Sequence, residues 1–116
     1  MIAEITLPNG KQPVVWACDP MHANTFVAGA HKTRHFDAIM AEIEGFFVAC
    51  RAERVWPGGV HLEYTGEDVT ECLGGSEQLA VEQLDHRYET LCDPRLNHMQ
   101  SLELAFLVAE ELTAPQ

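Results

Sequence analysis

Three residues of types that bind divalent cations lie in separate segments of the sequence: His22, Glu63 and Asp93. One imidazole and two carboxylates suit an ion such as Mn²⁺, Fe²⁺ or Zn²⁺. Their wide separation is compatible with a site built from the ends of several strands. No compact motif of paired histidines supports such a site. In the alternative interpretation, His22 caps a loop, Glu63 pairs with a cation and Asp93 shapes the turn before Pro94.

Four further residues could take part in the same chemistry. His61 lies two residues before Glu63, on the same face of an expected strand, and could support that carboxylate or act as a further ligand. Lys32, Arg34 and Arg95 could bind phosphate. In so acidic a chain, ordinary ion pairs are the favoured role for these three cations.

A strand, a helix and a second strand are expected to position these residues. The apolar run 14–18 ends at Asp19-Pro20 and predicts a buried strand, with His22 just beyond it. Apolar residues at three- and four-residue spacing predict a helix over 34–54, capped by Thr33. Alternation over 60–65 predicts the second strand. Parallel strands joined by a crossover helix would place both strand ends, with His22 and Glu63, at one edge.

The remaining segments are expected to be less regular. Residues 23–32 and 66–97 are predicted to be loops, the second with a short helix near 79–87 for which Ser76 is a candidate cap. Asn97 and Gln100 resemble a capping box before a helix over 98–112. That helix is apolar nearly all round, which indicates burial on more than one side.

The N-terminal segment allows two interpretations. The turn signal Pro8-Asn9-Gly10-Lys11 could join strands at 2–7 and 13–17 into a hairpin. Alternatively, residues 1–12 are a lead-in to the strand at 14–18.

Composition limits the class of protein. The 116 residues include 18 acidic and 7 basic side chains, for a net charge of −11. Such a surface argues against nucleic acid and anionic membranes as partners. The sequence shows neither a membrane-spanning run nor a secretion signal, so we expect a cytoplasmic protein. The four cysteines, Cys18, Cys50, Cys72 and Cys92, are expected to be reduced thiols, mostly buried.

Several segments resemble the C-terminal part of class II 3-deoxy-D-arabino-heptulosonate 7-phosphate (DAHP) synthases. They are CDPMHANT, KTRHFD, WPGGVHLEYTGEDVTECLGG, RYETLCDPRLN and QSLELAFLVAE. Together they cover about residues 14–112. The resemblance implies an α/β fold, namely a partial TIM barrel made of the last two β/α units. It divides the single domain 1–116 into a divergent lead-in (1–13), a synthase-like part (14–112) and a tail (113–116).

The resemblance also implies an activity and its site. The family condenses phosphoenolpyruvate with erythrose 4-phosphate at a divalent metal, for which Mn²⁺ is expected first and Co²⁺, Fe²⁺ or Zn²⁺ are alternatives. Its histidine, glutamate and aspartate ligands match His22, Glu63 and Asp93. The metal would act as a Lewis acid on the aldehyde carbonyl.

Departures from the family pattern leave alternatives open. No segment matches the family's upstream cysteine ligand or its phosphate-binding lysine and arginine motifs, and Cys18 does not take that cysteine's place. A TIM barrel needs ~250 residues. The isolated chain is therefore expected to be inactive and to self-associate or bind a larger protein. The alternatives are a non-catalytic metal-binding remnant, an interaction subunit docking on a larger synthase, or a small metal-binding protein with new chemistry.

Overall fold

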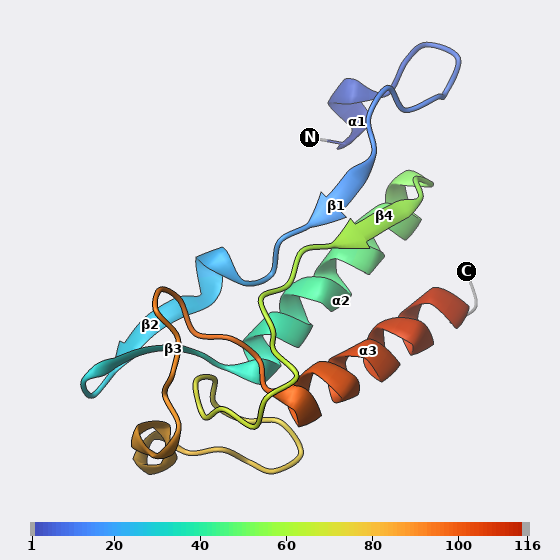
Figure 1. Ribbon diagram of the computed structural model, residues 1–116. Coiled ribbons are helices and arrows are strands. Elements are labelled where there is room, and N and C mark those ends of the chain that lie inside the picture. The colour runs from blue at the N-terminus through green and yellow to red at the C-terminus, as the bar shows by residue number, and fades with distance from the viewer. Residues whose placement is uncertain (1, 115–116) are drawn as a thin grey trace.

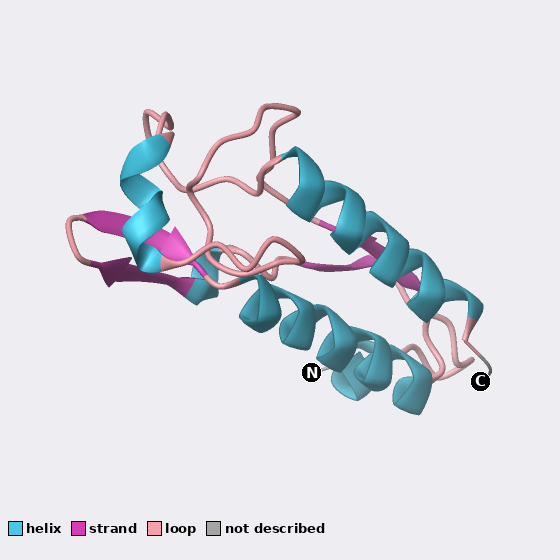
Figure 2. Cartoon of the chain, turned by 90° about the horizontal axis from the view of Figure 1, so that it is seen from below, coloured by secondary structure: helices cyan, strands magenta, loops and turns pink. Residues whose placement is uncertain are grey.

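The computed structural model describes residues 2–114 and shows a mixed α/β arrangement (Figure 1). Two long helices, α2 and α3, run side by side (Figure 2). In chain order the elements are α1 (Ile2–Ile5), β1 (Trp16–Cys18), the 3-10 turn η1 (His22–Asn24), β2 (Thr25–Ala28), β3 (His31–Arg34), α2 (Phe36–Glu53), β4 (Pro57–Val60), the 3-10 helix η2 (Val81–His86) and α3 (His98–Thr113).

The predicted parallel strand pair is confirmed. β1 and β4 pair in parallel, with Cys18 opposite Val60, and α2 lies between them in the sequence. Just beyond β4, the amide of His61 donates to the carbonyl of Cys18 at 2.8 Å. Both strands therefore end at one edge. Beyond that edge, the chain leads from β1 to His22 and from β4 to Glu63.

The second strand begins earlier than the sequence suggests. Pro57-Gly58-Gly59 has the composition of a breaker, yet these residues open β4, which already ends at Val60. A Cβ at Gly58 would lie 2.6 Å from the carbonyl oxygen of Trp16 and 2.4 Å from a methyl of Val15. Only glycine lets the two backbones approach this closely.

Gly58→Ala should therefore destabilise the β1–β4 pair. The methyl group would meet backbone that cannot give way, and overpacking of this kind typically costs ~1–3 kcal/mol. Gly59→Ala is the matched control, because nothing lies within 4 Å of the Cβ it would add. Urea unfolding of both variants and wild type would measure the difference, and equal losses for the two would contradict this explanation.

Helix α2 supplies most of the core. Its buried stripe faces side chains from the long loop and α3: the cluster is Met21, Phe36, Ile39, Met40, Ile43, Phe47, Cys72, Leu96 and Leu104. The helix starts two residues later than expected. His35, and not Thr33, is its N-cap, and its ring accepts a hydrogen bond from the amide of Asp37 at 3.2 Å.

The expected loop at 23–32 is wrong. Residues 25–34 form an antiparallel hairpin in which Thr25 pairs with Arg34 and Ala28 with His31. Thr33 is a buried strand residue, and its hydroxyl donates to the carbonyl of Glu71 at 2.9 Å. Gly29, with φ of 62°, makes the turn. The segment carries too little apolar alternation to indicate a strand.

The N-terminal hairpin is also wrong within the described residues. Ile2–Ile5 is a short helix, α1, with no strand partner there. The turn signal itself is confirmed: the amide of Gly10 donates to the carbonyl of Leu7 at 2.9 Å, and Gly10 has φ of 80°.

The C-terminal half follows the sequence more closely. The expected helix near 79–87 is the 3-10 helix η2, which begins after Ala80, so Ser76 is not its cap. Asn97 and Gln100 form the predicted capping box of α3. Thr113 of the expected tail still belongs to α3, whereas residues 115–116 lie outside the described part.

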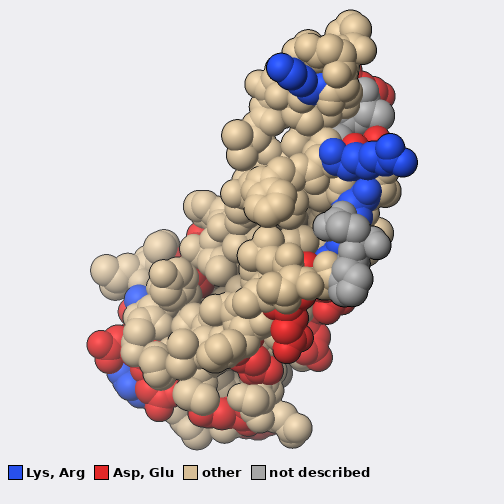
Figure 3. Space-filling view, turned by 90° about the vertical axis from the view of Figure 1, so that its right-hand side faces the viewer, with Lys and Arg blue, Asp and Glu red and all other residues tan. Residues whose placement is uncertain are grey.

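Large apolar side chains remain uncovered. Val15 is 82% exposed, Trp56 76% and Phe106 70%. The expected burial of α3 on several sides and of the strand at 14–18 is therefore not met within the described chain. Figure 3 shows a broad uncharged surface on one side of the molecule, with acidic residues gathered along its lower part. The radius of gyration is 16.2 Å, against roughly 13 Å for a compact domain of this length. No described helix is both long and apolar enough to cross a membrane.

Candidate metal centre

The structure brings His22, Glu63 and Asp93 together. His22 Nε2 lies 2.9 Å from Glu63 Oε1, and one ligand atom from each of the three residues lies within 4.8 Å of the others. His22 is exposed, and the two carboxylates are partly buried. The predicted proximity is thus confirmed, while the role of these residues as metal ligands stays a prediction.

Asp19 fixes His22. Its Oδ2 lies 2.6 Å from His22 Nδ1, and its Oδ1 accepts from the amides of Met21 at 3.0 Å and His22 at 3.3 Å. Although desolvation opposes ionisation, these hydrogen bonds and the imidazole outweigh it and lower the pKa of Asp19. With Nδ1 held by a carboxylate, Nε2 is the nitrogen available to a metal.

Sequence reasoning missed Asp19, although the signal was present. Asp19 and Asp93 both occupy Cys-Asp-Pro triplets, whose recurrence looked coincidental in the sequence. In the structure both aspartates reach the same place. One orients His22 and the other lies beside it.

A backbone bridge joins Glu63 to the loop that carries Asp93. The amide of Leu96 donates to the carbonyl of Glu63, and the amide of Thr65 donates to the carbonyl of Leu96, each at 3.0 Å. This parallel bridge pairs Tyr64 with Leu96, three residues after Asp93. Beyond the His61 amide, which still donates to Cys18 of β1, residues 63–65 therefore pair with the loop at Leu96.

The three cations near the site all take part in ion pairs, as favoured by the sequence. Lys32 Nζ lies 3.0 Å from Asp93 Oδ1, Arg34 Nη1 lies 2.7 Å from Glu63 Oε2, and Arg95 Nη2 lies 2.8 Å from an oxygen of Glu71. The hydrogen bond and charge of Lys32 lower the pKa of Asp93, and the same pair raises the pKa of Lys32. One oxygen of Asp93 and one of Glu63 are not used by these pairs.

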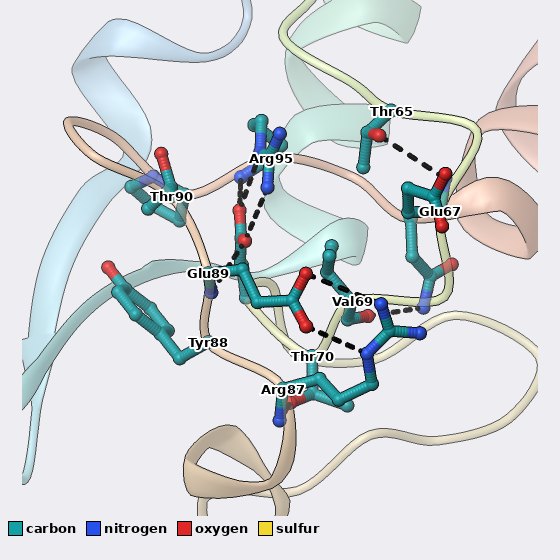
Figure 4. Close-up of polar contacts among 12 residues, drawn as sticks. Thr65, Glu67, Val69, Thr70, Arg87, Tyr88, Glu89, Thr90 and Arg95 are labelled. Carbon is teal, nitrogen blue, oxygen red and sulfur yellow. Dashed lines mark hydrogen bonds and ion pairs between the residues drawn. The ribbon is translucent and has the colours of Figure 1, made fainter.

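Glu71 anchors the loop that carries Asp93. It is fully buried and accepts from the side chain and amide of Arg95 and from the amide of Glu89, at 2.8–3.0 Å. Figure 4 shows Arg95 in this cluster and, beside it, Arg87 reaching the Glu89 carboxylate. Burial opposes ionisation of Glu71, but the hydrogen bonds from Arg95 and the amides prevail and lower its pKa.

The depressed pKa of Glu71 should appear in the pH dependence of stability. Because the folded-state pKa lies below the ordinary 4.5, this carboxylate stabilises the fold fully above that pH. The contribution is lost as the pH falls from about 4.5 through the folded-state pKa. Glu71→Gln should cost ~1.5–3 kcal/mol at pH 7 and less in acid. Urea unfolding between pH 7 and 3 would measure this, and a loss independent of pH would contradict it.

The donor set fits a divalent cation of borderline character. One nitrogen and two carboxylate oxygens converge from three segments, and each carboxylate keeps one oxygen that is not paired with a lysine or arginine. His61 does not join this group. Its ring lies 5.8 Å from that of His22, and it belongs to a second, exposed group with Asp19 and His22. The two groups share His22, so His61 remains a neighbour whose role is open.

No described cysteine belongs to the groups that could hold a metal. All four are free thiols; Cys18, Cys50 and Cys72 are buried and Cys92 is exposed. Burial raises the pKa of Cys18 and of Cys50, and that of Cys72 to about 12. Buried, protonated thiols of this kind are inert, which agrees with leaving Cys18 out of the site.

Comparison with known sequences settles the family. The sequence model of the Class-II DAHP synthetase family matches residues 2–109, nearly the whole chain. The chain belongs to this family. Membership confirms the resemblance that the CDPMH, HLE and CDPRLN segments indicate.

Several curated proteins resemble the chain closely. It is 59% identical over 112 residues to phospho-2-dehydro-3-deoxyheptonate aldolase AroG of Mycolicibacterium smegmatis, covering 96% of the chain and 24% of that protein. It is 56% identical over 98 residues to the enzymes of the same name from Streptomyces coelicolor and Streptomyces lividans. These matches cover 84% of the chain, 22% of the first enzyme and 67% of the second. The chain thus spans about a quarter of the first two relatives.

Proposed function

We propose that the chain carries the metal-binding part of a class II DAHP synthase, which condenses phosphoenolpyruvate with erythrose 4-phosphate. The observation that supports this most directly is the convergence of His22, Glu63 and Asp93 beyond the ends of two parallel strands. In barrel enzymes that edge is where catalytic groups collect.

The three residues would hold the divalent metal, with Mn²⁺ the expected ion. A bound metal supplies Lewis acidity toward a carbonyl oxygen. Three other residues of the chain hold the candidate ligands in place. Asp19 holds the Nδ1 of His22 in a hydrogen bond. Arg34 binds one oxygen of Glu63, and Lys32 binds one oxygen of Asp93.

The fold is proposed to be a section of a (β/α)₈ barrel. β1 and β4 would be its last two strands, and α2 and α3 the helices that follow them. Two features support this. The strands are parallel with α2 between them in sequence, and α2 and α3 run in the same general direction (Figure 1). The lengths of the M. smegmatis and S. coelicolor relatives leave room for the rest of a barrel.

A specific observation favours a non-catalytic role for the isolated chain, such as a metal-binding subunit docking on a larger synthase. Lys32, Arg34 and Arg95 are the cations at this edge, and each is engaged by a carboxylate. A substrate phosphate would have to compete with these carboxylates for each of the three cations. Positioning both phosphates is essential, because orientation can supply ~7–11 kcal/mol of a barrier.

A chimera distinguishes these proposals. The matching 112 residues of the M. smegmatis enzyme would be replaced by this chain, and loss of phosphoenolpyruvate would be followed. We expect the chimera to turn over and the isolated 116-residue chain not to. His22→Ala in the chimera should lower turnover by roughly 10³-fold, since metal Lewis acidity supplies several kcal/mol. His98→Ala, on the exposed start of α3, is the control. A folded, metal-loaded chimera without activity would contradict the proposed function.

A further inference from the structure

Arg34 is the one arginine whose side chain the described structure buries completely. Its side-chain exposure is 0%, at the end of β3 and immediately before the cap of α2. Burial of a guanidinium is costly unless every donor finds an acceptor. Arg34 does not meet that condition, because its Nη2 is buried and has no hydrogen-bond partner.

The acceptors of Arg34 come from all three segments that carry the candidate ligands. Nη1 donates to Glu63 Oε2 at 2.7 Å and to the carbonyl of Pro94, next to Asp93, at 2.6 Å. Nε donates to the hydroxyl of Thr25 at 3.0 Å, directly after the turn that contains His22. One guanidinium therefore joins three segments that are far apart in sequence.

The backbone of Arg34 is itself held. Its carbonyl accepts from the amide of Leu73, and the carbonyl of Leu73 accepts from the amide of Phe36, both at 2.8 Å. With the main chain clamped on the long loop, the planar guanidinium has a fixed origin. It can set the orientation of the groups it binds.

The division of the Glu63 oxygens gives this contact its significance. Arg34 takes Oε2, and Oε1 is left facing His22 Nε2 at 2.9 Å. An arginine serving stability alone would be replaceable by an apolar side chain of similar size, since buried ion pairs rarely outweigh their desolvation. The unpaired Nη2 makes this pair still less favourable. The contacts are better explained by alignment of the site.

We propose that Arg34 is a positioning residue that holds Glu63, the Asp93 loop and the His22 turn in the geometry that binds the divalent metal. This deepens the proposed function and rests on it for the presence of the metal. Lysine cannot replace arginine fully, because a single ammonium lacks the planar fork that reaches Nε and Nη acceptors together.

The test is titration of Mn²⁺ into the purified chain by calorimetry, with folding checked by circular dichroism and thermal melting. Arg34→Met should weaken binding 10- to 100-fold, the usual effect of removing a group that orients metal ligands. Arg34→Lys should restore part of the loss. Arg51→Met is the matched control. Arg51 on α2 also donates to a glutamate, Glu111 on α3, and Glu111 belongs to neither group that could hold a metal.

A spectroscopic measurement separates alignment from stability. At saturating Co²⁺, the visible absorption of folded Arg34→Lys should differ from that of wild type, because the ligand geometry changes. If Arg34→Met does not fold, Thr25→Val removes only the Nε acceptor and should weaken Mn²⁺ binding at least twofold.

The two proposals fail in different ways. Absence of Mn²⁺ binding by folded wild type would overturn the metal site itself. The role of Arg34 would be overturned if folded Arg34 variants kept wild-type Mn²⁺ affinity and an unchanged Co²⁺ spectrum. If Arg34→Met does not fold, unchanged Mn²⁺ affinity in Thr25→Val would overturn it instead. An equal loss in Arg51→Met would also overturn it.

Discussion

Replacing His22 with alanine is expected to abolish detectable Mn²⁺ binding by the isolated chain. His22 is the single nitrogen donor of the proposed set, and its Nε2 faces Glu63 Oε1 at 2.9 Å. Two carboxylates that are each paired with a cation, Asp93 with Lys32 and Glu63 with Arg34, would remain. Two carboxylates without the imidazole offer too few ligands to hold a divalent ion tightly. Calorimetry with Mn²⁺ on wild type and variant would measure the difference.

Two further variants sharpen this experiment. Glu63→Ala should have a comparable effect, whereas His86→Ala, an exposed histidine on η2, should leave the heats unchanged. Wild-type binding itself is expected to be modest, because three ligands hold the ion without a thiolate. Equal heats for wild type and Glu63→Ala would exclude the assignment.

The second large effect concerns association of the isolated chain. It should self-associate at micromolar concentration, since a groove of about 500 Å³ between residues 60–66 and α3 is lined mainly by apolar side chains such as Leu62, Leu102 and Val108. Phe106 stands 70% exposed on α3, and Val15 82% before β1. Strands β1 and β4 each have only the other as a sheet neighbour among the described residues, which leaves backbone donors and acceptors on their outer edges unpaired.

A single charge should reduce that association. Burying one large apolar side chain is worth ~1.5–3 kcal/mol, so Phe106→Lys should weaken self-association by roughly 10- to 100-fold. Val27→Lys, equally exposed but on the β2–β3 hairpin, is the control. Sedimentation velocity over a concentration series would measure both. A monodisperse wild-type monomer with a sharp cooperative melt would contradict this prediction.

The sequence predicts the long helices and the parallel strand pair around the site better than it predicts the shorter elements and side-chain contacts. The apolar stripe of the helix at 36–53 and the capping box of the helix at 98–113 predict both helices nearly to their ends. The proximity of His22 and Glu63 follows from parallel strands alone. These features depend on patterns that extend over many residues.

What could not be predicted depends on tertiary contacts. The β2–β3 hairpin has little alternation, because Thr33 and Arg34 are buried by partners more than 25 residues away. In the sequence, Gly58 indicates a break between elements. Only the structure shows that it lies against the carbonyl of Trp16. The pairing of Asp19 with His22 has short spacing, yet only the folded turn shows that the two side chains meet.

The backbone bridge at Leu96 also has a kinetic consequence. Its two hydrogen bonds, to Glu63 and from Thr65, keep the Asp93 loop beside the Glu63 strand. When they open, the carboxylate of Asp93 can move away from His22 and Glu63, the other two proposed ligands. Release of a metal bound at the proposed site should therefore be gated by this local opening. Amide hydrogen exchange at Leu96 and Thr65 should slow on metal loading, and the rate of metal release should not exceed the opening rate that this exchange reports.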